Sequence, residues 1–144
     1  MANRLKPILI CIIFEEHFGY VEGRQILDNV LLAQEMIHTL QAQEKASMII
    51  QLDLSKAYDK VSWDFIEDIL TAFGFDQCWI QWILSLVRTP SYSILFNGAP
   101  SFPFTPSRGI RQGDPISPFI FVIVMECLSR IIKISSIKSQ LTLS

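Results

Sequence analysis

The sequence predicts an α+β domain, in which a central strand and a β-hairpin carry helices packed on one face. Half of its 144 residues are hydrophobic, which suffices for a core in a chain of about one domain's length. Apolar residues recur at helical spacing in several segments, which indicates amphipathic helices. Residues 47–54 alternate instead as in a strand, and Asn97-Gly98 is the pair favoured in two-residue hairpin turns.

The first predicted elements are a long helix and the central strand. Apolar residues from Ile26 to Leu40 follow the helical period, which predicts a helix over 26–42 with a polar connection at 41–45. Within the strand over 47–54, alternation places the apolar side chains on the face that helices would cover, and Asp53 on the opposite face. The apolar set is Met48, Ile50, Leu52 and Leu54.

Two shorter helices are predicted after the strand. Ser62 is suited to cap a helix over 63–73, which Gly74 ends. Asp76 is suited to cap the next helix. The helical period predicts that the first helix buries Ile66, Ile69, Leu70 and Phe73, and that the second buries Trp79, Trp82, Ile83 and Leu86.

A hairpin and a basic loop come next. The hairpin over 91–104 turns at Asn97-Gly98, and its returning arm is an edge or irregular strand because proline donates no N–H. The prolines concerned are Pro100, Pro103 and Pro106. Residues 107–115 then form a loop that contains glycine and arginine.

A last helix closes the predicted fold. Ser117 followed by Pro118 is typical of a helix start, so the helix should run to about residue 133. Residues 135–144 carry weak signals and are expected to fray. Asp114, just before the helix, favours a turn or cap role.

Composition and charge narrow the classes of function. The chain has 12 Lys and Arg against 14 Asp and Glu, which excludes coating of nucleic acid by bulk positive charge but allows a local basic groove. The apolar runs at 7–14 and 119–125 fall short of the roughly 20 residues that a membrane span needs, so we expect core and no membrane partner. Three widely spaced cysteines indicate free thiols and an intracellular protein, nuclear or cytoplasmic.

Asp53 is the main candidate for chemistry. A carboxylate where a strand ends can hold a divalent cation, because the strand fixes the oxygen and the next turn offers backbone groups. The alternative is an aspartate that ends a strand and bonds its own turn. The strand alone does not choose between them.

A second stretch of the sequence favours the interpretation of Asp53 as a ligand of a divalent cation. DLSKAYD, residues 53–59, followed by RGIRQGDPISPFIF, residues 108–121, resembles the first two palm motifs of reverse transcriptases, and most closely those of non-LTR retrotransposons (LINE type) of plants. The resemblance extends in the same order over residues 3–133. The other matching stretches are NRLKPIL, EEHFGYVEGRQILDNVLLAQEMIH, VSWDFI, GFDQCWIQWI and YSILFNGAP.

The resemblance implies an organisation and a set of ligands. Residues 1–46 would join fingers to palm through the long helix, and residues 47–134 would form part of the palm. The implied partners are an RNA template, a DNA primer and deoxynucleoside triphosphates. The implied cofactor is Mg²⁺, as a pair of ions in phosphoryl transfer.

The resemblance also implies roles around the incoming nucleotide. The carboxylate of Asp53 and the carbonyl of Leu54 would hold the metal ions. The amides of Lys56 and Ala57 would cradle the triphosphate. Tyr58 would lie under the sugar and exclude a 2′-hydroxyl; its alternative is an ordinary core aromatic.

Further residues would contact nucleotide and nucleic acid. Gln112 and Gly113 match a turn that approaches the nucleotide and template. Arg108 and Arg111 would meet phosphates, or else form a solvated basic loop. Arg24 would contact phosphate or form a structural ion pair.

The sequence departs from the family in its carboxylates. It has no adjacent Asp-Asp pair and no acidic residue after Glu126. We therefore expect the hairpin that bears the family's Asp-Asp motif, and the thumb, to be absent, and the chain alone to be inactive. The alternative function is a non-catalytic remnant that binds nucleic acid or a protein partner.

Overall fold

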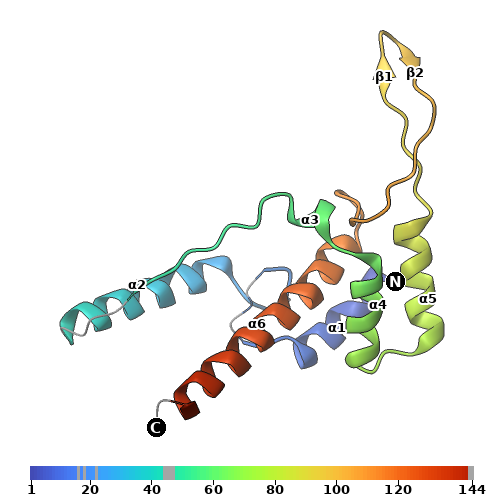
Figure 1. The fold of residues 1–144 in the computed structure, drawn as a ribbon. Helices are drawn as coiled ribbons and strands as arrows, with labels where there is room; N and C mark the ends of the chain where they lie inside the picture. The colour runs from blue at the N-terminus through green and yellow to red at the C-terminus, as the bar shows by residue number, and fades with distance from the viewer. Residues whose placement is uncertain (16, 18, 22, 44–47, 143–144) are drawn as a thin grey trace.

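The computed structural model describes residues 1–15, 17, 19–21, 23–43 and 48–142, and its elements are mostly helices (Figure 1). The helices and strands are α1 (Ala2–Ile12), α2 (Ile26–Ala42), α3 (Ala57–Lys60), α4 (Trp63–Ala72), α5 (Gln77–Arg88), β1 (Leu95–Phe96), β2 (Ala99–Pro100) and α6 (Ser117–Thr142). The strands pair in one antiparallel hairpin. The predicted mixture of α and β structure is therefore confirmed.

The core is formed by four helices. Helices α4 and α5 pack against each other, and α6 contacts both α1 and α4. Each buried Leu or Ile contributes about 1.5–3 kcal/mol relative to an exposed position, so this helical layer dominates the stability of the fold. Its most deeply buried side chains are Leu5, Leu9, Ile66, Leu70, Ile80, Ile83, Leu84, Ile120 and Ile123.

The predicted helices after residue 60 are confirmed, with corrections to detail. Asp76 caps α5, since its Oδ1 accepts hydrogen bonds from the amides of Cys78 (2.9 Å) and Trp79 (3.3 Å). Ser62 occupies the N-cap position of α4, but its side chain makes no capping hydrogen bond. The predicted buried stripe of α4 is correct for its isoleucines and leucine, with Phe73 partly buried.

The predicted buried face of α5 is wrong by about one position. Trp82 is 57% exposed and Leu86 is also exposed, whereas Ile83 is buried as expected. The helical period is compatible with both the predicted and the observed stripe of α5. The observed stripe is buried because it is the one that faces the neighbouring α4. The buried side chains of α5 are Ile80, Ile83, Leu84 and Val87.

The long helix over 26–42 is confirmed, but its expected packing is wrong. Asp28 accepts a hydrogen bond from the Gln25 amide (3.3 Å) at its start. Val30 and Ile37, two of the apolar residues that recur at helical spacing in this predicted amphipathic helix, are exposed. Figure 1 shows the reason: α2 and the segment after it extend away from the other helices. Residues 44–47, which include part of the polar connection and the predicted start of the strand, lie outside the described residues.

The predicted central strand is also wrong. Residues 48–54 are extended, but they form no strand, and none of the described residues makes a ladder with them. Met48 is 81% exposed and Leu52 is 72% exposed, so no helices cover this segment. A strand needs a hydrogen-bonded neighbour, and the hairpin of β1 and β2 lies elsewhere in the fold (Figure 1).

The hairpin is confirmed at its predicted turn. Asn97 (φ 50°) and Gly98 (φ 81°) both adopt the left-handed conformation that this turn requires. Leu95 pairs with Pro100 and Phe96 with Ala99, and the ladder ends there. The prolines limit the returning arm to a short edge strand, as predicted.

Helix α6 runs longer than predicted. It begins at Ser117 and continues to Thr142, beyond the predicted end near residue 133, and the fraying of residues 135–144 stays a prediction. Of the two apolar runs weighed as membrane segments, the run at 119–125 lies mostly in the core, in α6, whereas the run at 7–14 buries Leu9 and Ile13 and leaves Ile8 and Ile10 exposed. Among the described residues, none of the helices has the length and apolar character to cross a bilayer.

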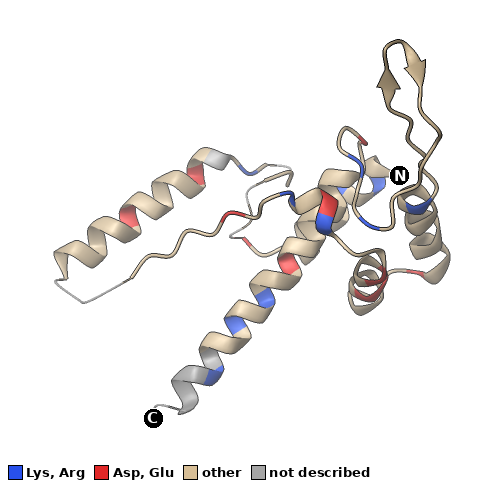
Figure 2. Cartoon of the chain, turned by 45° about the horizontal axis from the view of Figure 1, so that its top comes forward, with Lys and Arg blue, Asp and Glu red and all other residues tan. Residues whose placement is uncertain are grey.

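Charges are spread over several elements. Figure 2 shows mainly Asp and Glu on α2 and α4, and Lys and Arg along the later part of α6. The hairpin carries neither sign, because residues 89–107 contain no charged side chain. This distribution agrees with the expectation of a local basic site instead of a broad basic face.

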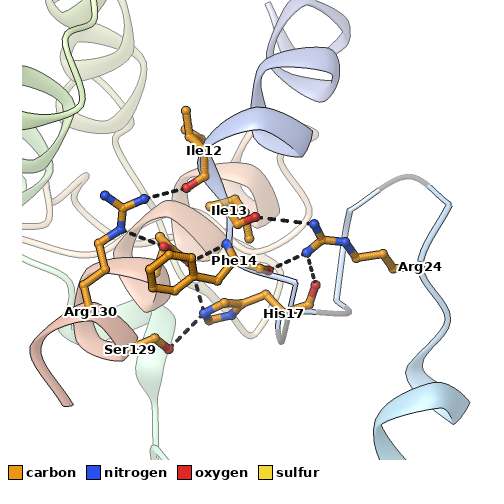
Figure 3. Close-up of polar contacts among 8 residues, drawn as sticks. Ile12, Ile13, Phe14, His17, Arg24, Ser129 and Arg130 are labelled. Carbon is orange, nitrogen blue, oxygen red and sulfur yellow. Dashed lines mark hydrogen bonds and ion pairs between the residues drawn. The ribbon is translucent and has the colours of Figure 1, made fainter. Parts of the chain in front are cut away.

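One carboxylate is completely buried and joins α6 to the end of α1. Glu126, 0% exposed, accepts hydrogen bonds from the Phe14 amide (3.0 Å) and from Arg130 Nε (2.7 Å). His17 Nε2 lies 3.3 Å from the same carboxylate and 2.9 Å from Ser129 Oγ (Figure 3). A buried carboxylate is tolerated here because every oxygen has a partner.

Two arginines complete this polar cluster by binding carbonyls at the end of α1 and in the loop after it. Arg130 Nη2 donates to the Ile12 carbonyl (2.8 Å). Arg24 donates to the carbonyls of Phe14 (2.6 Å) and His17 (2.7 Å), and at 3.4 Å to that of Ile13 (Figure 3). The carbonyls of Ile12 and Ile13 lie at the end of α1 and lack helical partners, so Arg130 and Arg24 donate to them, while the carbonyls of Phe14 and His17 lie in the loop after the helix.

We expect Glu126→Gln to destabilise the fold by about 1–3 kcal/mol, because Arg130 and the Phe14 amide lose a charged acceptor. Urea unfolding measures the change in the free energy of unfolding. Glu67→Gln is the matched control, since that carboxylate meets Arg88 at 3.5 Å on the surface and should cost under about 0.5 kcal/mol. Equal effects of the two substitutions would contradict the assigned role of Glu126.

Candidate functional site

The two segments predicted to carry the site are joined by their backbones. The Gly109 amide donates to the Val61 carbonyl (2.8 Å), and the Ile110 amide donates to the Tyr58 carbonyl (2.9 Å). Trp63 Nε1 adds a hydrogen bond to the Gly109 carbonyl (2.7 Å). The DLSKAYD and RGIRQG stretches, about fifty residues apart in sequence, are therefore neighbours.

Gly109 permits this approach for a steric reason. Its φ is 93°, and a Cβ at this position would lie 3.1 Å from the Asp59 carbonyl oxygen and 3.2 Å from the Asp59 Cα. Hydrogen bonds at Tyr58 and Val61 hold the Asp59 backbone on both sides, so it cannot easily move away. A side chain at position 109 would therefore be strained and would push the Asp59 backbone away by a few tenths of an ångström.

Asp53 and Leu54 lie on the extended segment that leads into α3. Both are exposed, and both line an open pocket of about 580 Å³ between this segment, α4 and α6. The other lining residues are Ser55, Ala57, Lys60, Val61, Ser62, Phe65, Phe121, Val124, Met125, Leu128 and Ile131. The pocket thus combines a mostly apolar floor with one carboxylate and one ammonium group.

The residues present do not fit a pair of magnesium ions. No three Asp, Glu, His or Cys side chains in the described part of the chain gather closely enough to hold a metal ion. Two ions in one site need several carboxylate oxygens, and Asp53 contributes one side chain. No catalytic step through a metal follows from this arrangement.

The turn after Asp53 begins α3. Lys56 adopts a left-handed conformation (φ 54°) at the N-cap, and its carbonyl accepts a hydrogen bond from the Asp59 amide (3.1 Å). Ala57 is partly buried and lines the same pocket as Asp53. The predicted triphosphate cradle is thus a tight turn beside the candidate carboxylate.

Tyr58 is partly buried and packs on α6. Its ring stacks on Phe121 with centroids 4.8 Å apart and an interplanar angle of 25°. Burial, and to a lesser degree the neighbouring Tyr20, raise the pKa of the Tyr58 hydroxyl. Both sequence interpretations, a ring under the nucleotide sugar and a packed aromatic, remain compatible with this position.

The basic loop lines a second pocket, of about 490 Å³, at the base of the hairpin. Arg108, Arg111 and Gln112 are exposed and lie together there. The pocket is completed by Asp59, Val87, Tyr92, Phe104, Pro106, Gly109 and Ile110. Of the predicted site residues, Asp53, Leu54 and Ala57 line the first pocket, and Arg108, Arg111 and Gln112 line the second. Lys56, Tyr58, Gly113 and Arg24 line neither of these two pockets.

Two further residues of this loop turn the chain into α6. Gly113 (φ 87°) is exposed in the turn and is not among the pocket's lining residues. Asp114 Oδ1 accepts from the Ile116 amide (3.0 Å), and the Asp114 carbonyl accepts from the Ser117 amide (3.1 Å). The predicted turn or cap role of Asp114 is confirmed.

Arg24 lies apart from both pockets. Its guanidinium binds the carbonyls after α1, so its observed partners are neither a phosphate-binding loop nor an acidic side chain. This arrangement favours a structural role for Arg24, in which backbone carbonyls replace the acidic partner of the expected ion pair. Contact with phosphate stays a prediction.

Comparison with known proteins identifies the family. The family model described as reverse transcriptase (RNA-dependent DNA polymerase) matches residues 1–142. The chain belongs to the reverse transcriptase family. This match covers both motif stretches and the helices that support them.

The relatives of this reverse transcriptase chain come from retrotransposons. It is 30% identical over 112 residues to the retrovirus-related Pol polyprotein from type-2 retrotransposable element R2DM of Drosophila melanogaster, covering 78% of the chain and 11% of that protein. It is 28% identical over 133 residues to the Transposon TX1 uncharacterized 149 kDa protein of Xenopus laevis, covering 90% of the chain and 10% of that protein. The chain thus spans about a tenth of the length of these relatives.

A shorter match involves a plant protein. An uncharacterized mitochondrial protein of Arabidopsis thaliana is 57% identical over 35 residues, which are 24% of the chain and 29% of that protein. The predicted resemblance to non-LTR retrotransposon enzymes is confirmed by the R2DM and TX1 relatives. Its plant subtype stays a prediction.

Sequence reasoning about this member of the reverse transcriptase family missed three features. Asp59, Tyr92 and Phe104 join the basic pocket without having been predicted there. The aromatic pair could not be read from the hairpin register, because extending the Leu95–Pro100 pairing outward places Tyr92 opposite Pro103, and the observed pairing with Phe104 is offset by one residue. The buried Glu126 cluster gave no local signal beyond charges after an apolar run.

We expect Gly109→Ala to destabilise the fold more than Gly113→Ala. Both glycines have positive φ, which costs a side chain about 1–2 kcal/mol, but only the Cβ at 109 meets the Asp59 backbone. Overlap with that backbone should add at least about 1 kcal/mol. Urea unfolding of both variants measures the difference, and equal destabilisation would show that the two motifs are not in close contact.

We expect Tyr58 to make the fold sensitive to alkaline pH. Its pKa is raised above the ordinary value, so the neutral phenol contributes stability that is full below about pH 10 and is lost as pH rises through the folded-state pKa. Tyr58→Phe cannot ionise, so its unfolding free energy should fall less between about pH 9 and about pH 11. Parallel curves for the two proteins would exclude this burial of Tyr58.

Proposed function

We propose that this chain forms the nucleotide- and template-facing part of an RNA-directed DNA polymerase, and that it binds nucleic acid without polymerising by itself. The observation that carries the proposal is the hydrogen-bonded junction between residues 58–61 and 109–110. This junction brings the two family motifs into one region. Family membership supplies the chemical context.

The first motif is proposed to receive the deoxynucleoside triphosphate. Amides of the turn at Lys56 and Ala57 would bind its phosphates. Tyr58, held by Phe121, would lie against the sugar, where a rigid ring leaves no space for a 2′-hydroxyl. The stacked position of Tyr58 supports this role because a selective barrier must not move.

The second motif is proposed to contact the primer and the RNA template. Arg108 and Arg111 would bind phosphates of the backbone, which fixes position without reading sequence. Gln112 and Gly113 would approach the nascent base pair, where glycine allows close contact. The gathering of both arginines and Gln112 around one pocket supports this role.

Asp53 and Leu54 are proposed as one contributor to the family's metal site. The sequence holds no Asp-Asp pair, and among the described residues Asp53 belongs to no group of three or more side chains that could hold a metal ion. Two-metal phosphoryl transfer needs them. We therefore propose binding, and not nucleotide addition, as the property of the chain alone.

The alternative function is a non-catalytic nucleic-acid-binding remnant. The basic pocket favours it as much as it favours the polymerase role, since phosphate contacts need no metal. The two functions differ in their response to nucleotide. Only a polymerase-derived site should bind a primer–template more tightly when the complementary deoxynucleotide is present.

We expect the chain to bind a labelled RNA–DNA primer–template with an affinity that falls as salt rises. Fluorescence anisotropy over a salt series should give a linear plot of log affinity against log salt concentration. Arg108→Ala and Arg111→Ala should each make this plot less steep, by about 0.7–0.9 for every phosphate that the variant no longer neutralises. Arg88→Ala is the matched control, because Arg88 pairs with Asp64 and Glu67 on the surface of α4.

Two outcomes would overturn the proposal. Affinity that does not change with salt would exclude phosphate-led binding. Efficient primer extension by the purified chain, in the presence of Mg²⁺ and deoxynucleotides, would show that Asp53 does not need the missing carboxylates. Tighter binding with the complementary deoxynucleotide would favour the polymerase role over the remnant.

A further inference from the structure

An aromatic pair stands at the base of the hairpin, beside the basic loop. The amides and carbonyls of Tyr92 and Phe104 exchange two hydrogen bonds of 2.8 Å. Directly opposed residues of an antiparallel pair share a face, and the two rings lie with centroids 6.0 Å apart at 32°. The backbone therefore fixes the rings as a pair.

These rings face the same pocket as the arginines. Tyr92 and Phe104 line it together with Arg108, Arg111 and Gln112. Phe104 is 49% exposed and Tyr92 is partly exposed, so part of each ring is accessible. The pocket thus places exposed aromatic surface next to two cations and an amide.

The charge around the pocket has a simple arrangement. Residues 89–107 carry no charge (Figure 2), and the hairpin arms contribute Tyr92, Phe104 and Pro106 to the pocket. The cations come from the loop after it, at Arg108 and Arg111. Asp59 adds one negative charge on the α3 side, which favours a bound phosphate near the arginines and away from α3.

We propose that the Tyr92–Phe104 pair and the adjacent arginines bind single-stranded nucleic acid, with unpaired bases stacked on the rings and phosphates on Arg108 and Arg111. Aromatic surface next to positive charge is the combination that single strands require. The inference rests on the proposed function and extends it to residues outside both family motifs. It assigns the base of the hairpin to the part of the bound nucleic acid strand that is not yet paired. The neighbouring junction of residues 58–61 and 109–110 would meet the nascent base pair.

Single strands fit this pocket better than duplex for a physical reason. A base can stack on a protein ring only when its own face is free, and bases inside a duplex already cover one another. The arginines bind phosphates of either form. Preference for the single strand must therefore come from Tyr92 and Phe104.

We expect Phe104→Leu to weaken binding of a single-stranded RNA or DNA oligonucleotide about tenfold, which is within the usual effect of losing one stacked base. The same substitution should not change binding of an abasic strand of equal length, which keeps the phosphates and lacks the bases. Phe102→Leu is the matched control, because Phe102 is 95% exposed on the same arm and is not among the pocket's lining residues. Anisotropy titrations of the full chain measure all of these affinities.

The strand types identify the source of the ligand. Tighter binding of RNA assigns the pocket to the template, and tighter binding of DNA assigns it to the primer strand; both support the inference. Binding of duplex as tight as either single strand would overturn it. So would an equal effect of Phe104→Leu on abasic and normal strands.

A photochemical crosslinking experiment on the unmodified protein tests the inference without variants, so the result does not depend on whether a variant folds. A single strand carrying a halogenated uracil should crosslink, in the unmodified protein, to Tyr92 or Phe104. Crosslinks confined to other residues would overturn the inference. If Arg108→Ala and Arg111→Ala weaken binding while Phe104→Leu does not, the stacking site fails and the proposed function stands; if the chain binds no nucleic acid, both fail.

Discussion

The backbone contact between the α3 segment and the Gly109 loop is the constraint on which the candidate site depends. Two hydrogen bonds and the Trp63 indole join segments that are about fifty residues apart in sequence. The contact needs a residue without a Cβ at 109, because the Asp59 backbone occupies the space. The proposals that treat Tyr58, Arg108, Arg111 and Gln112 as one region all depend on this close backbone contact.

The helical core and the buried Glu126 cluster hold α6 in place, and the junction packs on α6 through Tyr58. Helix α6 stacks Phe121 on Tyr58 and, further along, holds the end of α1 through Glu126 and Arg130. Deep burial of a carboxylate costs much solvation energy, which is recovered only when all its partners are in place. The cluster therefore ties the start of the chain to one position along α6.

The two pockets differ in what they can do. The pocket at Asp53 has an apolar floor and a single carboxylate, so it lacks the ligands of a two-ion site. The pocket at the hairpin base holds cations, an amide and an aromatic pair, which together suit nucleic acid. Binding thus has stronger support in this chain than catalysis. Exposed apolar side chains along residues 48–54 also leave an unpaired, strand-like segment at the side of the first pocket.

Local features of the fold were determined by the sequence. The Asp76 cap, the Asn97-Gly98 turn, the Asp114 cap and the extent of α2 each depend on residues a few positions apart, whose preferences act in any context. The ordered motifs also sufficed to identify the family, because they are matched by identity and not by packing. Within the site, the neighbourhood of the two motifs was predictable from the family, whereas the division into two pockets was not.

Only the tertiary structure decided which faces are buried and which segments pair. Residues 48–54 have the alternation of a strand, but a ladder needs a partner from elsewhere in the chain. The buried stripe of α5 depends on where α4 lies, and Glu126 binds the Phe14 amide, which is 112 residues away in sequence. Such contacts are set by long-range packing, about which local periodicity and composition carry no information.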